Sequence, residues 1–160
     1  MILVSACLCG HNCTYRGDNH HHPLFARLCR EGRAIPVCPE QLGGLPTPRP
    51  PSEILNGDGY DVLKDVARVV NSEGSDVSRF FVKGAVATLD VARRVGACRA
   101  VLKARSPSCG SGKIYDGTFS GRLRPGDGVT TALLRQHGIE VCSDEEYLAG
   151  QGADDDSESC

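Results

Sequence analysis

The sequence predicts an α/β protein, a single three-layer, Rossmann-like domain with a mostly parallel sheet. Short apolar runs alternate along the chain with amphipathic stretches of helical period, which is the pattern of parallel βαβ units. The chain has 160 residues, enough to bury one sizeable core and too few for two. We therefore expect one domain over residues 1–147 and a disordered acidic tail over residues 148–160.

The first part of the chain predicts two strands that each deliver a cysteine to a loop. Residues 2–6 form an apolar run that stops at the turn residues of segment 7–13. Residues 23–33 suit a short helix that a glycine closes. Residues 34–37 form a second apolar run, after which Cys38 opens a loop of Gly and Pro residues.

The middle of the chain predicts an extended connection, a strand and a long helix. Prolines dominate residues 45–53, so this segment is expected to be stiff and extended. A turn at residues 56–59 follows, and residues 67–70 predict a strand, which we expect at an edge. Asp76 is the expected N-cap of a helix that runs to residue 95, because apolar side chains recur on one face of that segment.

The last part of the chain predicts two more strands with a helix before the second. Residues 100–102 are apolar and end at a loop rich in Ser, Pro and Gly. Glycines punctuate residues 113–121, which predicts a small hairpin or an ordered loop. Residues 128–137 predict a helix closed by a glycine, and residues 139–142 predict the last strand.

Composition excludes several classes of function. The net charge is −2 and the pI is about 6.2, so no overall positive charge draws the chain to nucleic acid or to an anionic membrane. No apolar run approaches the roughly 20 residues of a membrane span. The N-terminus lacks the basic start and the small-residue cleavage site of a signal peptide. We therefore expect a cytoplasmic protein.

The chain contains nine cysteines, an odd number, which favours free thiols or metal-binding thiolates over a disulfide framework. Cys29, Cys98 and Cys142 lie in apolar or amphipathic patterns, where a cysteine usually behaves as a small hydrophobic residue. Cys160 ends the acidic segment and is expected to be a mobile free thiol.

Three other cysteines follow predicted strands, and these carry the functional prediction. In an open α/β sheet the binding crevice lies beyond the carboxyl ends of the strands, where Cys7, Cys38 and Cys109 are expected to meet. The chain has no Cys-x2-Cys pair of the kind common in structural zinc sites. An iron-sulfur cluster tolerates wider spacing and, with three cysteines, leaves one iron open as a Lewis acid. Spacing alone leaves a zinc site, a cluster, and inert or redox cysteines as alternatives.

Polar residues beside these cysteines are candidates for the chemistry. Glu40 could act as an acid or base, and Ser106 and Ser108 could supply hydroxyls. The alternative is that Glu40 is a solvated carboxylate and that the serines only shape a turn. Lys103 and Arg49, with the neighbouring Arg105, could hold an anionic or carbonyl-bearing ligand.

Three consecutive histidines, His20 to His22, suggest a metal site at first sight. Consecutive side chains in a regular element cannot all face one point, and these histidines adjoin a proline. An exposed surface turn is therefore the expectation.

Several motifs, taken together, resemble those of a known family. They are Ser5-Ala6-Cys7-Leu8-x-Gly10, Tyr15-Arg16-Gly17, the run from Val37 to Glu53 that begins Val-Cys-Pro-Glu-Gln-Leu-Gly-Gly, the run from Leu102 to Gly110, Ile114-Tyr115-Asp116-Gly117-Thr118-Phe119, and Gly126-Asp127-Gly128-Val129-Thr130. From residue 1 to about residue 145, the chain resembles the thiouracil desulfidases, iron-sulfur-dependent desulfidases formerly catalogued as a domain of unknown function.

The resemblance implies a cofactor and a reaction. The cofactor is a [4Fe-4S] cluster held by Cys7, Cys38 and Cys109, with one iron that carries no protein ligand. The reaction is the non-redox removal of sulfur from a thiolated pyrimidine, 2- or 4-thiouracil or thiouridine, to give the oxo base and hydrosulfide.

The resemblance also assigns roles to the polar residues. The essential glutamate of the family falls on Glu40, which would activate water or accept a serine proton. The essential serine falls on Ser106 or Ser108. Arg49 and Lys103 are expected to bind the substrate.

The chain departs from the family pattern in two places. Cys9 stands where an aliphatic residue is expected, and the three histidines stand near a stretch that is usually rich in Gly and Asn. Cys9 therefore leaves the choice of ligands open, and Cys13 is the reserve ligand.

Two other functions compete with desulfuration of a small molecule. Related proteins act on 4-thiouridine within tRNA, but those usually carry a further domain, and this chain has no overall basic charge. A non-enzymatic metal-binding or redox-sensing module would use the same cysteines without releasing sulfide.

Overall fold

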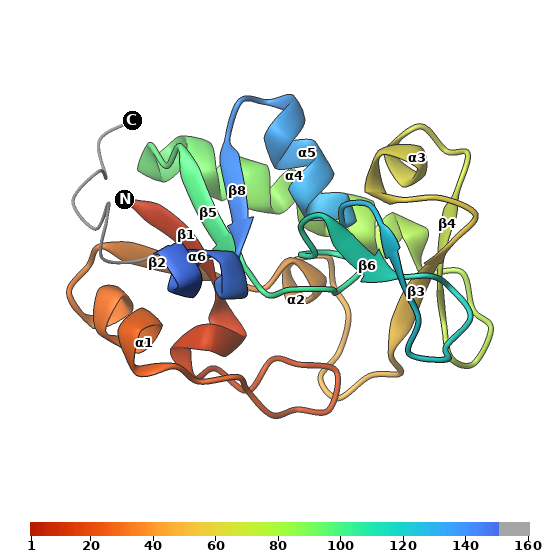
Figure 1. The fold of residues 1–160 in the computed structure, drawn as a ribbon, viewed down its shortest axis with the longest axis horizontal. Helices are drawn as coiled ribbons and strands as arrows, with labels where there is room; N and C mark the ends of the chain where they lie inside the picture. Colours follow the sequence, from red (N-terminus) through yellow and green to blue (C-terminus); the bar gives the residue numbers. More distant parts are fainter. Residues whose placement is uncertain (151–160) are drawn as a thin grey trace.

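The computed structural model of the chain describes residues 1–150. Its centre is a sheet of four parallel strands in the order β2-β1-β5-β8, which confirms the predicted α/β fold (Figure 1). The chain passes from β1 to β2 on one side of the sheet and from β5 to β8 on the other. The direction in which successive strands are added, and so the strand order, therefore reverses between β1 and β5. The strands are β1 (Ile2–Ser5), β2 (Ala34–Val37), β5 (Arg99–Leu102) and β8 (Glu140–Ser143).

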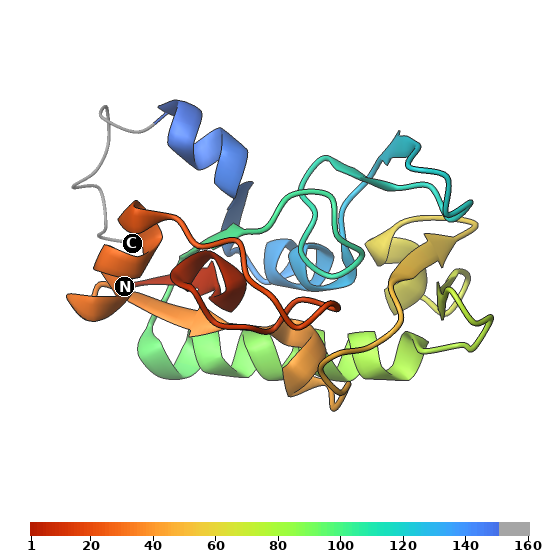
Figure 2. The same ribbon diagram turned by 90° about the horizontal axis from the view of Figure 1, so that it is seen from below.

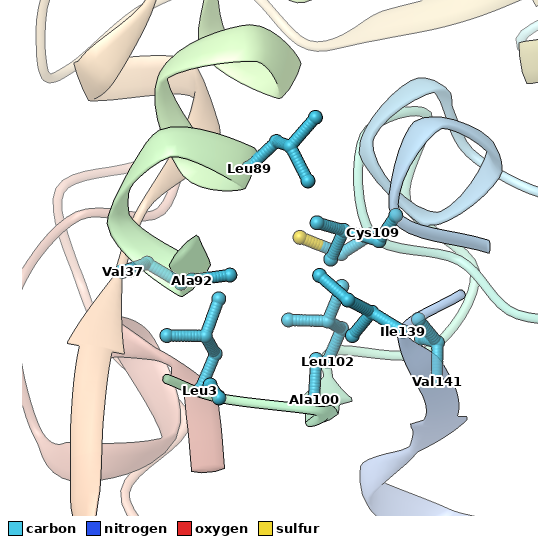
Figure 3. Packing of buried hydrophobic residues seen from close by; sticks show 11 residues of the cluster. Leu3, Val37, Leu89, Ala92, Ala100, Leu102, Cys109, Ile139 and Val141 are labelled. Atoms are coloured by element: carbon cyan, nitrogen blue, oxygen red, sulfur yellow. The ribbon is translucent and has the colours of Figure 1, made fainter. Parts of the chain in front are cut away.

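Helices cover both faces of this sheet and make three layers (Figures 1 and 2). Leu3 and Leu102 face α4 (Ser78–Val95) and α5 (Val129–Gln136) in one apolar cluster, which Figure 3 shows in part. Val4 and Val101, next to them in the strands, face the other cluster with α1 (Pro23–Arg30) and α6 (Asp144–Gly150). This alternation is what a strand buried on both faces requires.

Two antiparallel hairpins lie together at the end of the molecule far from α1 (Figure 1). One joins β3 (Ser52–Leu55) to β4 (Arg68–Asn71), with the short helix α3 (Gly59–Leu63) between them. The other joins β6 (Lys113–Tyr115) to β7 (Leu123–Pro125). A third apolar cluster, which includes Ile54, Val69 and Phe81, ties the first hairpin to α4.

The hairpins correct one prediction and refine another. The strand expected at residues 67–70 is not an edge of the main sheet; it pairs with β3, because the prolines end at Pro51 and Ile54 can then face Val69 across the ladder. The hairpin considered for residues 113–121 exists, but its second strand lies beyond that range, at β7.

Four short helices were not predicted, and one of them, α6, follows the last strand. The first strand ends at Ser5, and the one-turn 3-10 helix η1 (Ala6–Cys9) follows it. The helix α2 (Pro39–Leu42) occupies the expected Gly/Pro loop, with proline at its first position. A capping box between Asp58 and Asp61 begins α3.

The ends of the longer elements also differ slightly from prediction. The long helix begins at Ser78 rather than at Asp76, although the Asp76 side chain accepts the Ser78 N–H at 2.9 Å. Residues 148–150, placed in the acidic tail by the sequence, complete α6, and the rest of that predicted tail lies outside the described residues. Across residues 1–150 no helix is both long and apolar enough to cross a bilayer.

Candidate functional site

The three predicted cysteines line one cavity beyond the carboxyl ends of the parallel strands. Cys7 lies in η1 after β1, Cys38 directly follows β2, and Cys109 lies in the loop after β5. The cavity has a volume of about 590 Å³ and lies where the strand order reverses, the place where open α/β sheets bind their ligands. The topology of the sheet therefore brings together three thiols that are far apart in the sequence.

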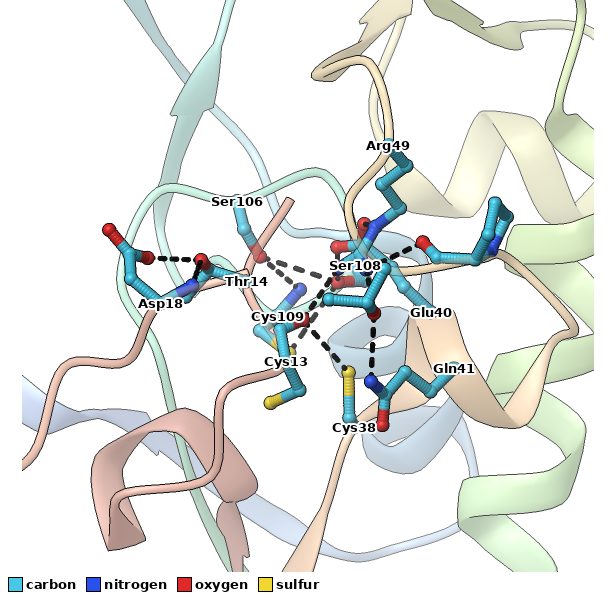
Figure 4. A network of polar contacts seen from close by, with 12 residues as sticks. Cys13, Thr14, Asp18, Cys38, Glu40, Gln41, Arg49, Ser106, Ser108 and Cys109 are labelled. Atoms are coloured by element: carbon cyan, nitrogen blue, oxygen red, sulfur yellow. Dashed lines mark hydrogen bonds and ion pairs between the residues drawn. The ribbon is translucent and has the colours of Figure 1, made fainter. Parts of the chain in front are cut away.

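A fourth thiol, that of Cys13, lines the same cavity. Its side chain contacts the thiols of Cys7 and Cys38, and the Cys38 thiol lies 3.7 Å from the Cys13 carbonyl oxygen (Figure 4). Cys9 does not line the cavity; its sulfur lies 3.7 Å from the Phe25 carbonyl oxygen and packs against Cys29. Cys13, and not Cys9, is thus the additional cysteine at the site.

Three thiols of the cavity, those of Cys13, Cys38 and Cys109, have a pKa raised above the ordinary value. Burial raises the pKa of the Cys109 thiol to about 11, although hydrogen bonds from Ser108 and Ser5 act in the opposite direction. The contact with Cys13, followed by burial, raises the pKa of Cys38 far above its ordinary value. A metal that binds these sulfurs must displace their protons, so its affinity depends on pH.

The arrangement of ligands bears on the kind of metal site. Within residues 1–150, no three His, Cys, Asp or Glu side chains converge on a point where a single metal ion could sit. Each cysteine of an iron-sulfur cluster binds its own iron, so its thiols surround the cluster. The cavity is lined by four soft thiols, which are the ligand type of such clusters.

Glu40 is one of three acidic residues that line the cavity, with Asp18 and Glu53, and both of its oxygens are occupied (Figure 4). Its Oε1 accepts a hydrogen bond from Arg49 Nε at 2.9 Å, and its Oε2 accepts one from Ser108 Oγ at 2.9 Å. The Glu40 side chain is only 17% exposed, so these two contacts fix its orientation.

Close packing places the helix that carries Glu40. A Cβ at Gly43 would lie 2.0 Å from the Phe80 carbonyl oxygen, and a Cβ at Gly84 would lie 2.0 Å from the Pro39 carbonyl oxygen. The two glycines let α2 rest directly on α4, which any larger side chain would prevent. The sequence therefore fixes the position of Glu40 through residues that have no chemical role.

Arg49 is buried beside Glu40, with a side chain 4% exposed. Besides the contact with Glu40, its Nη1 donates to Pro46 O and Thr47 Oγ1, and its Nη2 donates to Cys13 O at 2.9 Å. Every nitrogen of the guanidinium is engaged, so its geometry orients Glu40 and the Cys13 segment. The substrate contact of Arg49 stays a prediction.

The two candidate serines have different partners. Ser108 is 2% exposed and its Oγ lies 3.5 Å from Cys109 Sγ as well as 2.9 Å from Glu40 Oε2. Ser106 Oγ accepts the Cys109 N–H at 2.8 Å and lies 3.4 Å from Ser108 Oγ. Ser108 therefore connects the carboxylate with a cysteine, whereas Ser106 orders the backbone of the loop.

Lys103 and Arg105 line the cavity but already face acidic partners on α6. Lys103 Nζ lies 3.6 Å from Asp144 Oδ2, and Arg105 makes hydrogen bonds of 3.0 and 2.9 Å to Glu145. The Lys103 N–H also donates to Ser5 Oγ at 2.8 Å, and Ser5 Oγ in turn lies 3.6 Å from Cys109 Sγ. Ser5 is thus a further site residue, although in the sequence it stands only as the first residue of the Ser5-Ala6-Cys7 motif.

The three histidines do not act together. His22 Nδ1 accepts the Leu24 N–H at 3.1 Å and caps α1, His21 is exposed, and His20 lines the cavity. Burial, and then the charge of Lys103, lower the pKa of His20.

Aromatic side chains complete the cavity lining. Tyr15 and Phe119 are 38% and 39% exposed, and Tyr115 lies near them on β6. Two of the quoted motifs contain Tyr15 and Phe119, but neither residue type indicates a role by itself.

A family model described as 2-thiouracil desulfurase matches residues 2–146. The uncharacterized protein YbbK of Bacillus subtilis is 48% identical over 146 residues, which cover 91% of this chain and 97% of that protein.

A solved structure is similar over nearly the same length. The [4Fe-4S]-dependent thiouracil desulfidase TudS superposes with a TM-score of 0.81 at 43% sequence identity. The match covers 92% of this chain and 93% of that chain.

Proposed function

Because the chain belongs to the 2-thiouracil desulfurase family, we propose that it is a [4Fe-4S]-dependent desulfidase that acts on a thiolated pyrimidine. The observation that supports this most strongly is a cavity in which four thiols adjoin a carboxylate bonded to a serine hydroxyl. In the reaction, the oxygen of water replaces the thiocarbonyl sulfur, and the products are the oxo base and hydrosulfide. No electron is gained or lost.

In this proposal Cys7, Cys38 and Cys109 hold the cluster and leave one iron without a protein ligand. Each cysteine follows a different strand of the sheet, so the three thiols approach the cavity from separate directions. When bound, such a cluster supplies a Lewis-acidic iron with affinity for sulfur. Cys13 lies between Cys7 and Cys38 and is not needed as a fourth ligand.

Glu40 is the proposed base, and Ser108 is the serine best placed to work with it. A carboxylate oxygen 2.9 Å from a hydroxyl can take its proton directly. Ser108 Oγ can then attack the thiocarbonyl carbon, or it can pass to Glu40 the proton of an attacking water. Ser106 keeps a supporting role, since its Oγ accepts the Cys109 N–H and stabilises the loop.

The substrate contacts divide between two basic residues. Lys103 lines the cavity and remains the proposed contact for an oxygen of the pyrimidine. Arg49 acts through Glu40 and is a positioning residue.

Anaerobic reconstitution followed by a sulfide assay tests the function. We expect about four irons per chain, a broad visible absorbance, and sulfide released in equal amount to the oxo base. Assays with 2-thiouracil, 4-thiouracil, 4-thiouridine and thiolated tRNA would identify the substrate, and we expect the small molecules to be preferred. Faster sulfide release from thiolated tRNA would favour the alternative that the enzyme acts on 4-thiouridine within tRNA. Iron binding without sulfide release from any of the four substrates would favour the alternative of a non-enzymatic metal-binding or redox-sensing module.

A further inference from the structure

Phe119 stands out among the residues that line the cavity. Its ring is 39% exposed, and its backbone has a φ of 55°. A bulky residue rarely adopts this left-handed conformation, because its Cβ crowds the backbone. An aromatic side chain that is both strained and exposed needs a reason, and such residues cluster at sites that bind ligands.

The segment around Phe119 is rigidly held. Glu53, which is 9% exposed, accepts the N–H of Gly117 at 2.9 Å and that of Phe119 at 3.1 Å through Oε1. Gly117 lies so close to Ile54 that a Cβ there would be 2.6 Å from its carbonyl oxygen. A buried carboxylate thus fixes the loop with Phe119 at the cavity, which is more than a solvent-exposed turn requires.

The ring of Phe119 is also free of aromatic and cationic neighbours within the described part of the chain. Tyr15, the other exposed aromatic of the cavity, differs because the Arg16 guanidinium lies over its ring, 5.4 Å from the centroid. The exposed part of the Phe119 ring can therefore contact a planar ligand in the cavity.

We propose that Phe119 is the surface on which the pyrimidine ring of the substrate stacks. This inference rests on the proposed function, and it adds a binding residue that neither the cysteines nor Glu40 supply. Every base has a π-face, so stacking on an aromatic ring tolerates sulfur at either the 2 or the 4 position. Phe119 would hold the ring while polar groups deeper in the cavity select the thiocarbonyl.

Kinetics of Phe119→Gly test the proposal. Loss of stacking should raise KM on the order of 10-fold with kcat nearly unchanged, because it removes binding common to substrate and transition state. The thermal midpoint should stay unchanged or rise slightly, since glycine adopts a φ of 55° without strain. Leu123→Ala is the control, because Leu123 is 42% exposed on β7 and does not line the cavity.

A fluorescence titration tests the same contact without turnover. The chain has no tryptophan, so Phe119→Trp places a single reporter at the proposed surface. Uracil should quench its emission, whereas Leu123→Trp should be unaffected. Absence of quenching, or a wild-type KM in Phe119→Gly, would overturn the proposal. Quenching in a protein that releases no sulfide would sustain the stacking site while rejecting the desulfidase.

Discussion

Two groups of residues share the cavity and are built differently. The thiol set consists of Cys7, Cys13, Cys38 and Cys109, and the carboxylate network consists of Glu40, Arg49, Ser106 and Ser108. The thiol set comes from the ends of three strands and the segment after η1. Contacts of its sulfur atoms are long, at 3.7 Å from Cys38 Sγ to Cys13 O and 3.6 Å from Ser5 Oγ to Cys109 Sγ. The carboxylate network is joined by short hydrogen bonds, of 2.9 Å on both oxygens of Glu40.

This difference indicates two separate tasks. Thiols without short hydrogen bonds can give up their protons and accept a cofactor. A carboxylate fixed on both oxygens is already oriented and needs no rearrangement when the substrate arrives. Substitutions in the thiol set should therefore affect cofactor content first, and substitutions in the carboxylate network should affect turnover alone.

The largest effect is expected from Cys38→Ser. A hydroxyl is a poor ligand for iron, so the reconstituted variant should contain little iron and release no measurable sulfide. Iron analysis and the anaerobic sulfide assay would measure both. Cys142→Ser is the matched control, because Cys142 is a partly buried thiol outside the cavity lining. Full iron content in Cys38→Ser would remove Cys38 from the ligand set.

Glu40→Gln should separate the two tasks most clearly. The amide keeps the size of the side chain but cannot take a proton, so kcat should fall at least about 100-fold. Iron content and the visible spectrum should match those of the wild type. Glu73→Gln, at an exposed carboxylate, is the control. A fully active Glu40→Gln enzyme would exclude Glu40 from the chemistry.

The two serines should differ in the same assay. Ser108→Ala removes the hydroxyl that bonds to Glu40, and we expect kcat to fall on the order of 10- to 100-fold. Ser106→Ala removes only an acceptor of the Cys109 N–H and should cost less. If Ser106→Ala proves the more damaging change, the roles of the two serines must be exchanged.

The smallest effect is expected from Cys13→Ser. If three cysteines hold the cluster, this variant should keep its iron content and most of its activity. The substitution also keeps the hydrogen bond from Arg49 to the Cys13 carbonyl oxygen, because that bond involves the backbone. Iron analysis of the reconstituted variant is the measurement. Loss of iron comparable to that in Cys38→Ser would show four ligands and contradict an open iron.

The apolar and helical patterns of the sequence predicted the regular elements of the main sheet and its longest helix. The four strands of the main sheet and the helix that ends at Val95 follow from apolar runs and helical period. The β3–β4 hairpin was missed because its partners are separated by a turn and a helix, so only the tertiary pairing of Ile54 with Val69 defines it. The short helix α2 was missed because one turn carries too little periodicity to detect.

The site, like the fold, has features that the local sequence predicts and features that depend on tertiary contacts. The position of the cysteines after strands predicted that they lie in one cavity, because the carboxyl ends of parallel strands meet at the same edge of the sheet. The role of Arg49 could not be predicted, because its guanidinium reaches Glu40 and the Cys13 carbonyl only after the proline-rich segment folds across the cavity. Ser5 was missed for a similar reason, as its partner Cys109 lies 104 residues away.

Graded iron loading gives the most direct test of the central claim, that the thiol set holds the cofactor on which the carboxylate network acts. Wild-type protein would be reconstituted without oxygen to several iron contents, and sulfide release from 4-thiouracil would be measured on each sample. We expect release to rise in proportion to cluster content from zero, and Glu40→Gln to stay near zero at every loading. Activity that is independent of iron, as in a colourless zinc-bound protein, would contradict the account.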